Sequence, residues 1–442
     1  MNARILGVLA LAGIARLPFL SAGFGADPDA WWVAVTARAS HERIDYVLSR
    51  VPGHPVLDVL NALVVPGGAV ALNGVSALFS LAAVALFNRL AVRFGVERPA
   101  LWTLAFAFLP LVYLQSVQAL DYLPALAFLL LSIELACAGH PGFAGVALGF
   151  ATGCRITSLA MLVPLVVLAP RGGRVHAARS LAIAAVLTAA ALFAPVVQSE
   201  GFKVFRFVQT PYPPLVFLLK SVTLDVFGIV GLAAVAIALA FVRLRRSADL
   251  RLDAFVAIAV AVFGIAFLRL PDDAAYLLPI VPLVLLWLAT RVRGAAAVAV
   301  CACLVASPFV LKVRNPRRVG GPTAAVPGFA LPGGYVLDLP GAIFADRARR
   351  LAGMRYAAAV LDSARALPPQ SLLVVGDWYP VLGWSADAAT LARITQFPDP
   401  RQLAAGRAGR LAIRVLPELG RAREDTGGPA LRAAGATPLV VR

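Results

Sequence analysis

The feature that most constrains this chain is a series of about eleven apolar runs, each roughly long enough to cross a bilayer. Short polar gaps separate them in a 442-residue sequence that is 60% hydrophobic and 14% charged. An ordinary soluble domain is closer to half apolar and a quarter charged. The sequence therefore predicts a polytopic α-helical membrane protein with about eleven transmembrane helices. They are expected at residues 4–24, 68–92, 99–118, 121–138, 141–155, 156–170, 178–198, 225–242, 253–269, 275–290 and 294–312.

Charge alternates between the gaps in a way that predicts orientation. Arginine gathers in every second short gap, at Arg89, Arg93, Arg98, Arg171, Arg174, Arg179, Arg243, Arg245, Arg246, Arg251, Arg291 and Arg293. Aspartate occupies the other gaps, at Asp27, Asp29, Asp121, Asp272 and Asp273. The positive-inside bias then predicts a cytoplasmic N-terminus, with the aspartates and the C-terminus outside. The net charge of +17 is a topology signal that meets anionic lipid. It does not indicate nucleic-acid binding, because no recognition motif accompanies it.

Two external loops are too polar to span the bilayer. The loop 25–67 contains two segments with helical periodicity, 29–38 and 57–64, which could lie flat on the membrane surface. The loop 199–224 combines prolines with aromatic residues, which suits either an interfacial aromatic belt or a mobile loop over a lipid site. The first apolar run could also be a signal peptide, but a retained span is preferred because a long series of spans follows it.

The character of the chain changes near its last predicted span. Residues 1–312 are expected to form the membrane domain, and residues 313–442 a Gly- and Pro-rich linker followed by a small extracytoplasmic α/β domain. In this C-terminal region the pattern predicts helices over 347–367 and 429–434, and strands over 371–375, 411–415 and 438–441. No nucleotide-binding glycine motif occurs there, so a structural cap is the preferred interpretation over a catalytic role.

Asp27 and Asp29 are the leading candidates for chemistry. Carboxylates beside a membrane are costly, and functional by default. Two of them separated by one residue in a turn can bind one divalent metal ion, or one can act as a base. Because ordinary polar turns share this pattern, the position of the pair directly after the first predicted span is what singles it out.

Further candidates are spread over the predicted outer face. Asp121 can cap the fourth predicted span, contribute to an outer site, or do both. Arg155 lies between two apolar runs and needs a partner, either a lipid phosphate, which a guanidinium binds with two parallel hydrogen bonds, or one of the aspartates. The remaining candidates for substrate or phosphate binding are His54, Lys203, Arg206, Asp272, Asp273 and Tyr276. Each has an ordinary alternative, such as packing in a proline turn, solvation of a loop, or anchoring at the interface.

Taken in order, these motifs resemble the GT-C superfamily of membrane glycosyltransferases, which includes protein O-mannosyltransferases and lipid A aminoarabinose transferases. The resemblance covers roughly residues 1–300. It rests on Asp27 and Asp29, on Ser49–Pro55, which is similar to the family's Pro-Gly-x-Pro turn, on Asp121, on Gly149–Thr157, which is similar to a Gly-x-x-x-Gly-x-Arg hairpin, and on Tyr276–Pro279. Many relatives have adjacent acids at the first motif, whereas Pro28 intervenes here, which leaves metal binding by Asp27 and Asp29 open.

The resemblance implies a fold, a membrane and a reaction. Relatives work at the outer face of the bacterial cytoplasmic (inner) membrane and take sugars from a polyprenyl-phosphate donor. Asp27 would deprotonate the acceptor, which could be a lipid, a glycan or a protein, and Asp29 would assist it or bind a metal. Arg155, with Lys203 or Arg206, would hold the lipid phosphate as it leaves.

Two other functions compete with this one. A transporter or flippase of lipid-linked sugars would usually place its ionisable groups near the bilayer midplane and show inverted repeats. Here most charges lie at the ends of the apolar runs, and no repeat is evident. The other competitor is a non-catalytic assembly partner that acts through its external domain.

Overall fold

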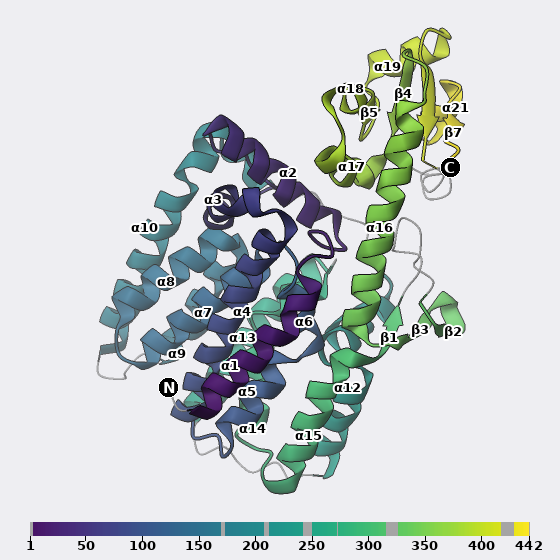
Figure 1. Ribbon diagram of the computed structural model, residues 1–442. Helices are drawn as coiled ribbons and strands as arrows, with labels where there is room; N and C mark the ends of the chain where they lie inside the picture. The colour runs from purple at the N-terminus through teal and green to yellow at the C-terminus, as the bar shows by residue number, and fades with distance from the viewer. Residues whose placement is uncertain are drawn as a thin grey trace.

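The computed structural model describes residues 3–168, 173–206, 212–241, 250–271, 273–314, 326–416 and 428–441. A helical bundle extends to Ala306, and a long helix leads from it to a small C-terminal region (Figure 1). The bundle consists of α1 (Ala3–Arg16), α2 (Pro28–Arg43), α3 (Pro55–Val64), α4 (Gly68–Arg93), α5 (Pro99–Ala107), α6 (Pro110–Gln115), α7 (Tyr122–Cys137), α8 (Pro141–Cys154), α9 (Leu162–Leu168), α10 (Arg174–Glu200), α11 (Leu215–Val222), α12 (Leu224–Phe241), α13 (Leu250–Arg269), α14 (Val281–Ala289) and α15 (Gly294–Ala306).

Neighbouring helices of the bundle bury one apolar core. The helices α4, α7, α8 and α10 pack successively against one another, and α12 packs against α15. In the core, Phe87 of α4 stacks on Phe106 of α5 with ring centroids 4.6 Å apart. Large apolar side chains such as Ile14, Leu78 and Ile265 are exposed on the outside. Apolar residues on both sides of a helix suit contact with lipid outside and with protein inside.

Prolines break several of the predicted spans. The predicted span 99–118 forms two short helices, α5 and α6, because Pro110 lacks an N–H group and holds Leu109 in an extended conformation. The predicted span 275–290 likewise divides into the 3-10 helix η6 (Ala274–Leu277) and α14. Within the described ranges, three helical segments are long and apolar enough to cross a membrane, or four if the bent pair α11 and α12 counts as one. The count of eleven spans is therefore not confirmed.

A fully buried arginine ties the first helix to the bundle. Arg16 donates hydrogen bonds to the Ser116 hydroxyl at 2.7 Å, to the Ala12 carbonyl at 2.7 Å and to the Ala107 carbonyl at 2.9 Å. Its guanidinium also lies 5.0 Å from the centre of the Tyr113 ring. A charged group in an apolar bundle requires such partners, and here they fix where α1 lies against α5 and α6.

The C-terminal region contains two small sheets. The strands β1 (Val310–Arg314), β2 (Gly328–Ala330) and β3 (Val336–Pro340) form an antiparallel sheet in the order β1-β3-β2. The long helix α16 (Ala342–Arg365) then leads to a parallel sheet in the order β5-β4-β6-β7. That sheet comprises β4 (Ser371–Val374), β5 (Ile394–Thr395), β6 (Ala412–Val415) and β7 (Thr437–Pro438), with short helices η10 (Gly376–Trp378), α17 (Tyr379–Ser385), α18 (Ala388–Leu391), α19 (Pro400–Arg407) and α21 (Gly428–Ala433) around it.

Most of the elements predicted for this region are present. The helix α16 and the strands β4 and β6 match predicted elements, and β7 is a shorter, shifted form of the predicted strand 438–441. The antiparallel sheet was not predicted. Its first strand, β1, lies where the last apolar run was expected to continue as a helix. The helix α15 ends at Ala306, and the chain turns into β1 after Pro308.

Two arginines hold the C-terminal region against the bundle. Arg350 of α16 is buried and donates hydrogen bonds to the carbonyls of Val117 at 2.9 Å and Phe19 at 3.0 Å. Arg38 of α2 lies 3.9 Å from the centre of the Trp384 ring and donates a hydrogen bond to the Trp384 carbonyl at 2.9 Å. The C-terminal region therefore sits over the end of the bundle that carries α2, at the opposite end from the N-terminus (Figure 1).

Candidate active site

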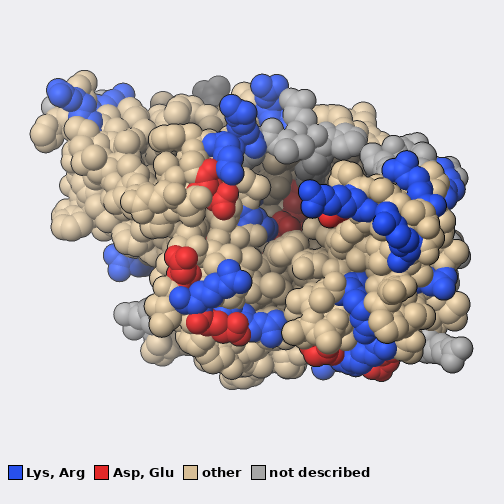
Figure 2. All heavy atoms as spheres, turned by 90° about the horizontal axis from the view of Figure 1, so that it is seen from above, with Lys and Arg blue, Asp and Glu red and all other residues tan. Residues whose placement is uncertain are grey.

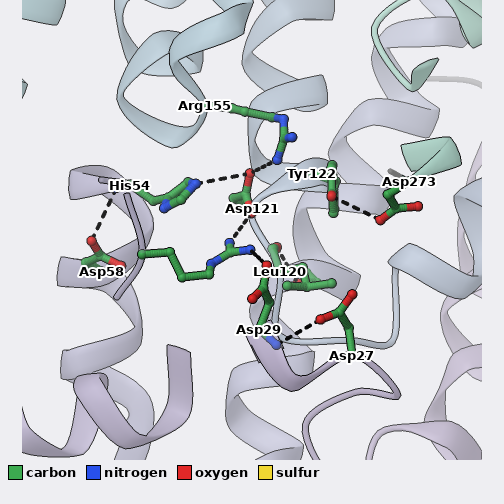
Figure 3. A network of polar contacts seen from close by, with 11 residues as sticks. Asp27, Asp29, His54, Asp58, Leu120, Asp121, Tyr122, Arg155 and Asp273 are labelled. Atoms are coloured by element: carbon green, nitrogen blue, oxygen red, sulfur yellow. Dashed lines mark hydrogen bonds and ion pairs between the residues drawn. The ribbon is translucent and has the colours of Figure 1, made fainter. Parts of the chain in front are cut away.

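Asp121 is the centre of a buried ion-pair network. It occupies the N-cap position of α7, but its side chain makes no capping hydrogen bond, and it is 0% exposed. It accepts hydrogen bonds from Arg50 and Arg155, both at 2.5 Å, and lies 3.6 Å from His54 Nε2 (Figure 3). Two guanidinium groups thus neutralise one carboxylate, as a charge buried beside a membrane requires. The helix-capping role considered from the sequence is therefore wrong for this side chain.

Arg155 is held on several sides by protein groups. Its guanidinium lies 4.3 Å from the centre of the Tyr122 ring and 4.6 Å from that of Tyr276, in addition to its ion pair with Asp121. Two aromatic rings and a carboxylate compensate the charge of a buried guanidinium. Of the two roles left open for Arg155, the geometry favours the structural ion pair over a lipid phosphate. The predicted site residue Tyr276 therefore contacts Arg155.

Asp27 faces a cavity, whereas Asp29 faces the ion-pair network. Asp27 caps α2 by accepting a hydrogen bond from the Asp29 backbone N–H at 2.9 Å, which is the usual reason for an aspartate before a helix. Enclosure by the surrounding protein, followed by the negative charges of Asp29 and Asp273, raises the pKa of Asp27 to about 6. Asp27 is therefore a carboxylate with a raised proton affinity that remains open to the cavity.

Arg50 joins the two halves of the site. It donates to Asp29 at 2.6 Å with one Nη atom and to Asp121 at 2.5 Å with the other. The start of α2 is thereby tied to the start of α7, which places Asp27 at a fixed point beside the network (Figure 3). Arg50 belongs to the Ser49–Pro55 motif, but no role was predicted for it. The sequence of a polar turn does not indicate which carboxylates its arginine will pair with in the folded protein.

The metal role left open for Asp27 and Asp29 stays a prediction, because both carboxylates already have protein partners. One Asp27 oxygen accepts a backbone N–H, and the Asp29 carboxylate pairs with Arg50. Over the described part of the chain, no three His, Cys, Asp or Glu side chains gather where they could hold a metal ion. A divalent cation needs a larger oxygen shell, or substrate phosphates that complete it.

His54 and Asp273 flank the network on opposite sides. His54 is 5% exposed, and burial lowers its pKa to about 3, so its ring is neutral at physiological pH. Asp273 accepts hydrogen bonds from the Tyr122 hydroxyl at 3.1 Å and from the Ala275 N–H at 2.9 Å, and it lines the cavity. His54 does not line that cavity, and its Nε2 lies 3.6 Å from an Asp121 oxygen. Asp272 lies outside the described residues.

Lys203 and Arg206 do not join the other candidates. The Lys203 side chain is 74% exposed and pairs with Glu200 at 3.7 Å. Arg206 is exposed at the end of the short helix η5 (Phe202–Phe205). Neither residue lines the cavity. The sequence placed Lys203 and Arg206 on the same outer face as Asp27. It contained no signal that they would lie away from the cavity.

The cavity itself has a volume of about 620 Å³ and lies between the bundle and the C-terminal region. Its walls come from the loop before α2, from α6, from α11 and α12, and from β1, η10 and α16. Seen from the side of α2 and the C-terminal region, the surface is hollowed here, with acidic and basic side chains in the hollow (Figure 2). The sequence analysis assigned no role to any of the lining cations, which are Lys220, Lys312, Arg314, Arg349 and Arg350.

Solved structures of the protein ArnT are similar to this chain. ArnT from Cupriavidus metallidurans in the apo state has a TM-score of 0.60 and 14% identity, with 96% of this chain and 94% of that chain covered. The same protein bound to undecaprenyl phosphate has a TM-score of 0.55 and 15% identity, with 98% and 89% covered. No family model matches the sequence, and no curated protein is significantly similar to it. Likeness at this identity concerns the fold alone: this chain shares the polytopic helical fold of ArnT, with a small sheet region near its C-terminus.

Proposed function

We propose that this protein is a GT-C glycosyltransferase that transfers a sugar from a polyprenyl-phosphate donor to a lipid, glycan or protein acceptor outside the cytoplasm. The observation that carries this proposal is the carboxylate of Asp27, which faces a cavity of about 620 Å³ between the membrane bundle and the C-terminal region. The fold, shared with a protein whose structure holds undecaprenyl phosphate, supports the donor class.

In this reaction Asp27 acts as the general base. It takes the proton from an acceptor hydroxyl or amine while the acceptor atom forms a bond to the anomeric carbon of the sugar. The bond between that carbon and the phosphate oxygen breaks, and its electron pair leaves with the phosphate. A pKa of about 6 keeps Asp27 ionised at neutral pH and makes it a better proton acceptor than an ordinary aspartate.

The buried network positions this base. Arg50 holds Asp29 and Asp121 together, and Asp29 supplies the backbone N–H that orients the Asp27 carboxylate. None of Arg50, Asp121 and Arg155 lines the cavity, so they are positioning residues. A charge removed from this set would leave its partners buried without compensation, at a cost of about 3–5 kcal/mol.

The test compares surface glycans and lipids, by mass spectrometry, in a deletion strain that is complemented with variants. We expect a sugar modification to be missing from the deletion strain and from the strain that carries Asp27→Asn, since loss of a general base lowers rates about 10²–10⁴-fold. Asparagine caps helices as well as aspartate does, so α2 should still form. Asp362→Asn, on an exposed part of α16, is the matched control and should restore the modification.

Two results would overturn the proposal. The first is full restoration of the modification by Asp27→Asn and by Asp29→Asn at normal protein levels. The second is transport of labelled lipid-linked sugar across vesicles of the purified protein without any transfer product, which would make the protein a flippase.

A further inference from the structure

The cavity has a cationic end that the proposed chemistry of Asp27 does not use. Lys220 of α11, Lys312 of β1 and Arg349 of α16 all line it. Lys312 lies within electrostatic reach of the other two, together with Asp225 and Asp346. The three cations come from three separate elements, two of which belong to the C-terminal region.

The carboxylates nearby leave this cationic end incompletely neutralised. Lys220 is well paired, with Asp225 oxygens at 2.6 and 2.7 Å. Arg349 has a long contact of 3.8 Å with Asp346, and its buried Nε has no hydrogen-bond partner. Among residues that the structure describes, the side chain of Lys312 makes neither a hydrogen bond nor an ion pair.

A partly buried ammonium group without a partner is unfavourable. Burial, followed by repulsion from Arg349, lowers the pKa of Lys312 to about 8. Lys312 belongs to strand β1, which follows the last helix of the bundle. An anion that entered the cavity would stabilise the charged form of the lysine and would meet the unpartnered Nε of Arg349. The arrangement is thus suited to an anion of more than one charge, such as a phosphate.

The helix α11, which forms the wall beside these cations, also carries apolar side chains on its outer surface. Along α11, Phe217 and Lys220 line the cavity, whereas Leu215, Val216 and Leu219 are between 54% and 67% exposed. A short helix with one face on a charged cavity and an apolar outer face is typical of a membrane interface. An acyl or prenyl chain could therefore pass along α11 while its head group remains among the cations.

We propose that Lys312 and Arg349, assisted by Lys220, bind the phosphate group of a lipid-linked ligand in this cavity. The C-terminal region would then supply part of the donor site, in place of Arg155, Lys203 and Arg206. That the lipid is the sugar donor rests on the proposed function. That a lipid phosphate binds at this position rests on the cations and the outer face of α11.

The test measures binding of undecaprenyl phosphate to the full-length protein in lipid nanodiscs by native mass spectrometry. We expect Lys312→Met and Arg349→Met each to weaken binding at least about tenfold, since a hydrogen bond to a charged group is worth about 1.5–3 kcal/mol. Lys203→Met, which changes an exposed lysine outside the cavity, is the matched control and should bind as the unchanged protein does. Lys312→Arg should retain most of the affinity.

Two further ligands distinguish lipid phosphate from other occupants. Undecaprenol, which lacks the phosphate, and inorganic phosphate should each bind much more weakly than undecaprenyl phosphate. Inorganic phosphate that binds as tightly as the lipid would overturn the assignment to a lipid ligand. Unchanged binding in the Lys312→Met and Arg349→Met proteins would overturn the site itself.

This experiment separates the binding site from the proposed reaction. Asp27→Asn should bind undecaprenyl phosphate normally, because Asp27 serves the acceptor in the proposed reaction. If Lys312→Met loses binding although no strain lacks a glycan or lipid modification, the site stands and the proposed function fails. If Lys312→Met binds normally while Asp27→Asn abolishes the modification, the proposed function stands and the site fails.

Discussion

At the residue scale, the Asp121 carboxylate accepts hydrogen bonds from Arg50 and Arg155, whereas Asp27 faces the cavity with a backbone N–H on one of its oxygens. Two aspartates of one network therefore differ in what their charge can do. The charge of Asp121 is neutralised by protein groups and holds the fold together. The charge of Asp27 is available to a ligand in the cavity. A pH titration of activity should therefore report on Asp27.

The pH dependence of sugar transfer should report Asp27. Its pKa is raised to about 6 and its ionised form is the base, so transfer should fall as the pH drops through about 6. Apart from enclosure by protein, the charge of Asp29 contributes most to this pKa. Asp29→Asn should therefore lower the pKa and shift the decline to lower pH. Transfer by purified protein in vesicles, followed from about pH 4.5 to 8, measures this. A decline that stays in place in Asp29→Asn would mean that another group titrates.

The sequence identified the members of the site better than it identified their partners. Asp27, Asp121, Arg155 and Tyr276 were expected at one place, and they lie within one network or beside it. Their ionic partners could not be inferred, because a pairing such as Arg50 with Asp121 spans 71 residues and depends on how helices pack. Lys312 was missed for a related reason, since a lysine at the end of an apolar run is usually an interfacial anchor.

At the element scale, apolar runs predicted where helices occur, and local chemistry decided where they end. Pro110 interrupts a run that was expected to be continuous, and the break could have been foreseen from the proline alone. Strand β1 could not have been foreseen in the same way. Val310–Arg314 continues an apolar run, and a short run of this kind has no period that separates a strand from a helix.

A glycine stripe on α8 sets how closely that helix approaches α10. A Cβ atom at Gly145 would fall against the Leu181 carbonyl oxygen, and one at Gly149 against the Thr188 side chain. Small residues at four-residue spacing allow this approach in membrane bundles. Gly149→Ala should therefore destabilise the protein by about 1–3 kcal/mol through overpacking. It should also reduce transfer, because α8 ends next to Arg155.

The matched control for this substitution is Gly264→Ala. No atom lies within 4 Å of a Cβ placed at that glycine of α13. Its thermal unfolding in detergent should match or exceed that of the unchanged protein, because alanine favours helix. If Gly149→Ala and Gly264→Ala unfold at the same temperature, the close approach of α8 and α10 contributes nothing measurable.

At the scale of the whole molecule, the cavity exists because two parts of the chain meet. Arg350 reaches carbonyls more than 200 residues earlier, with a separation of 233 residues to Val117. Such contacts leave no local pattern in the sequence. Composition therefore predicted a separate external domain, but it did not predict that this domain packs against the bundle. The consequence for function is that the lining of the cavity combines Asp27 from the bundle with Lys312 and Arg349 from the C-terminal region.

Orientation in the membrane is the property on which the outward-facing site depends. The arginine-rich gaps predict that the N-terminus is cytoplasmic and that α16 lies outside. A cysteine at Asp362, whose side chain is 74% exposed, should react with a membrane-impermeant maleimide in intact spheroplasts. A cysteine at Arg174, exposed at the start of α10, should react only after the cells are opened. Both are placed in a protein whose four native cysteines are changed to alanine. The opposite labelling pattern would put Asp27 and the cavity on the cytoplasmic side, where an acceptor outside the cell could not reach them.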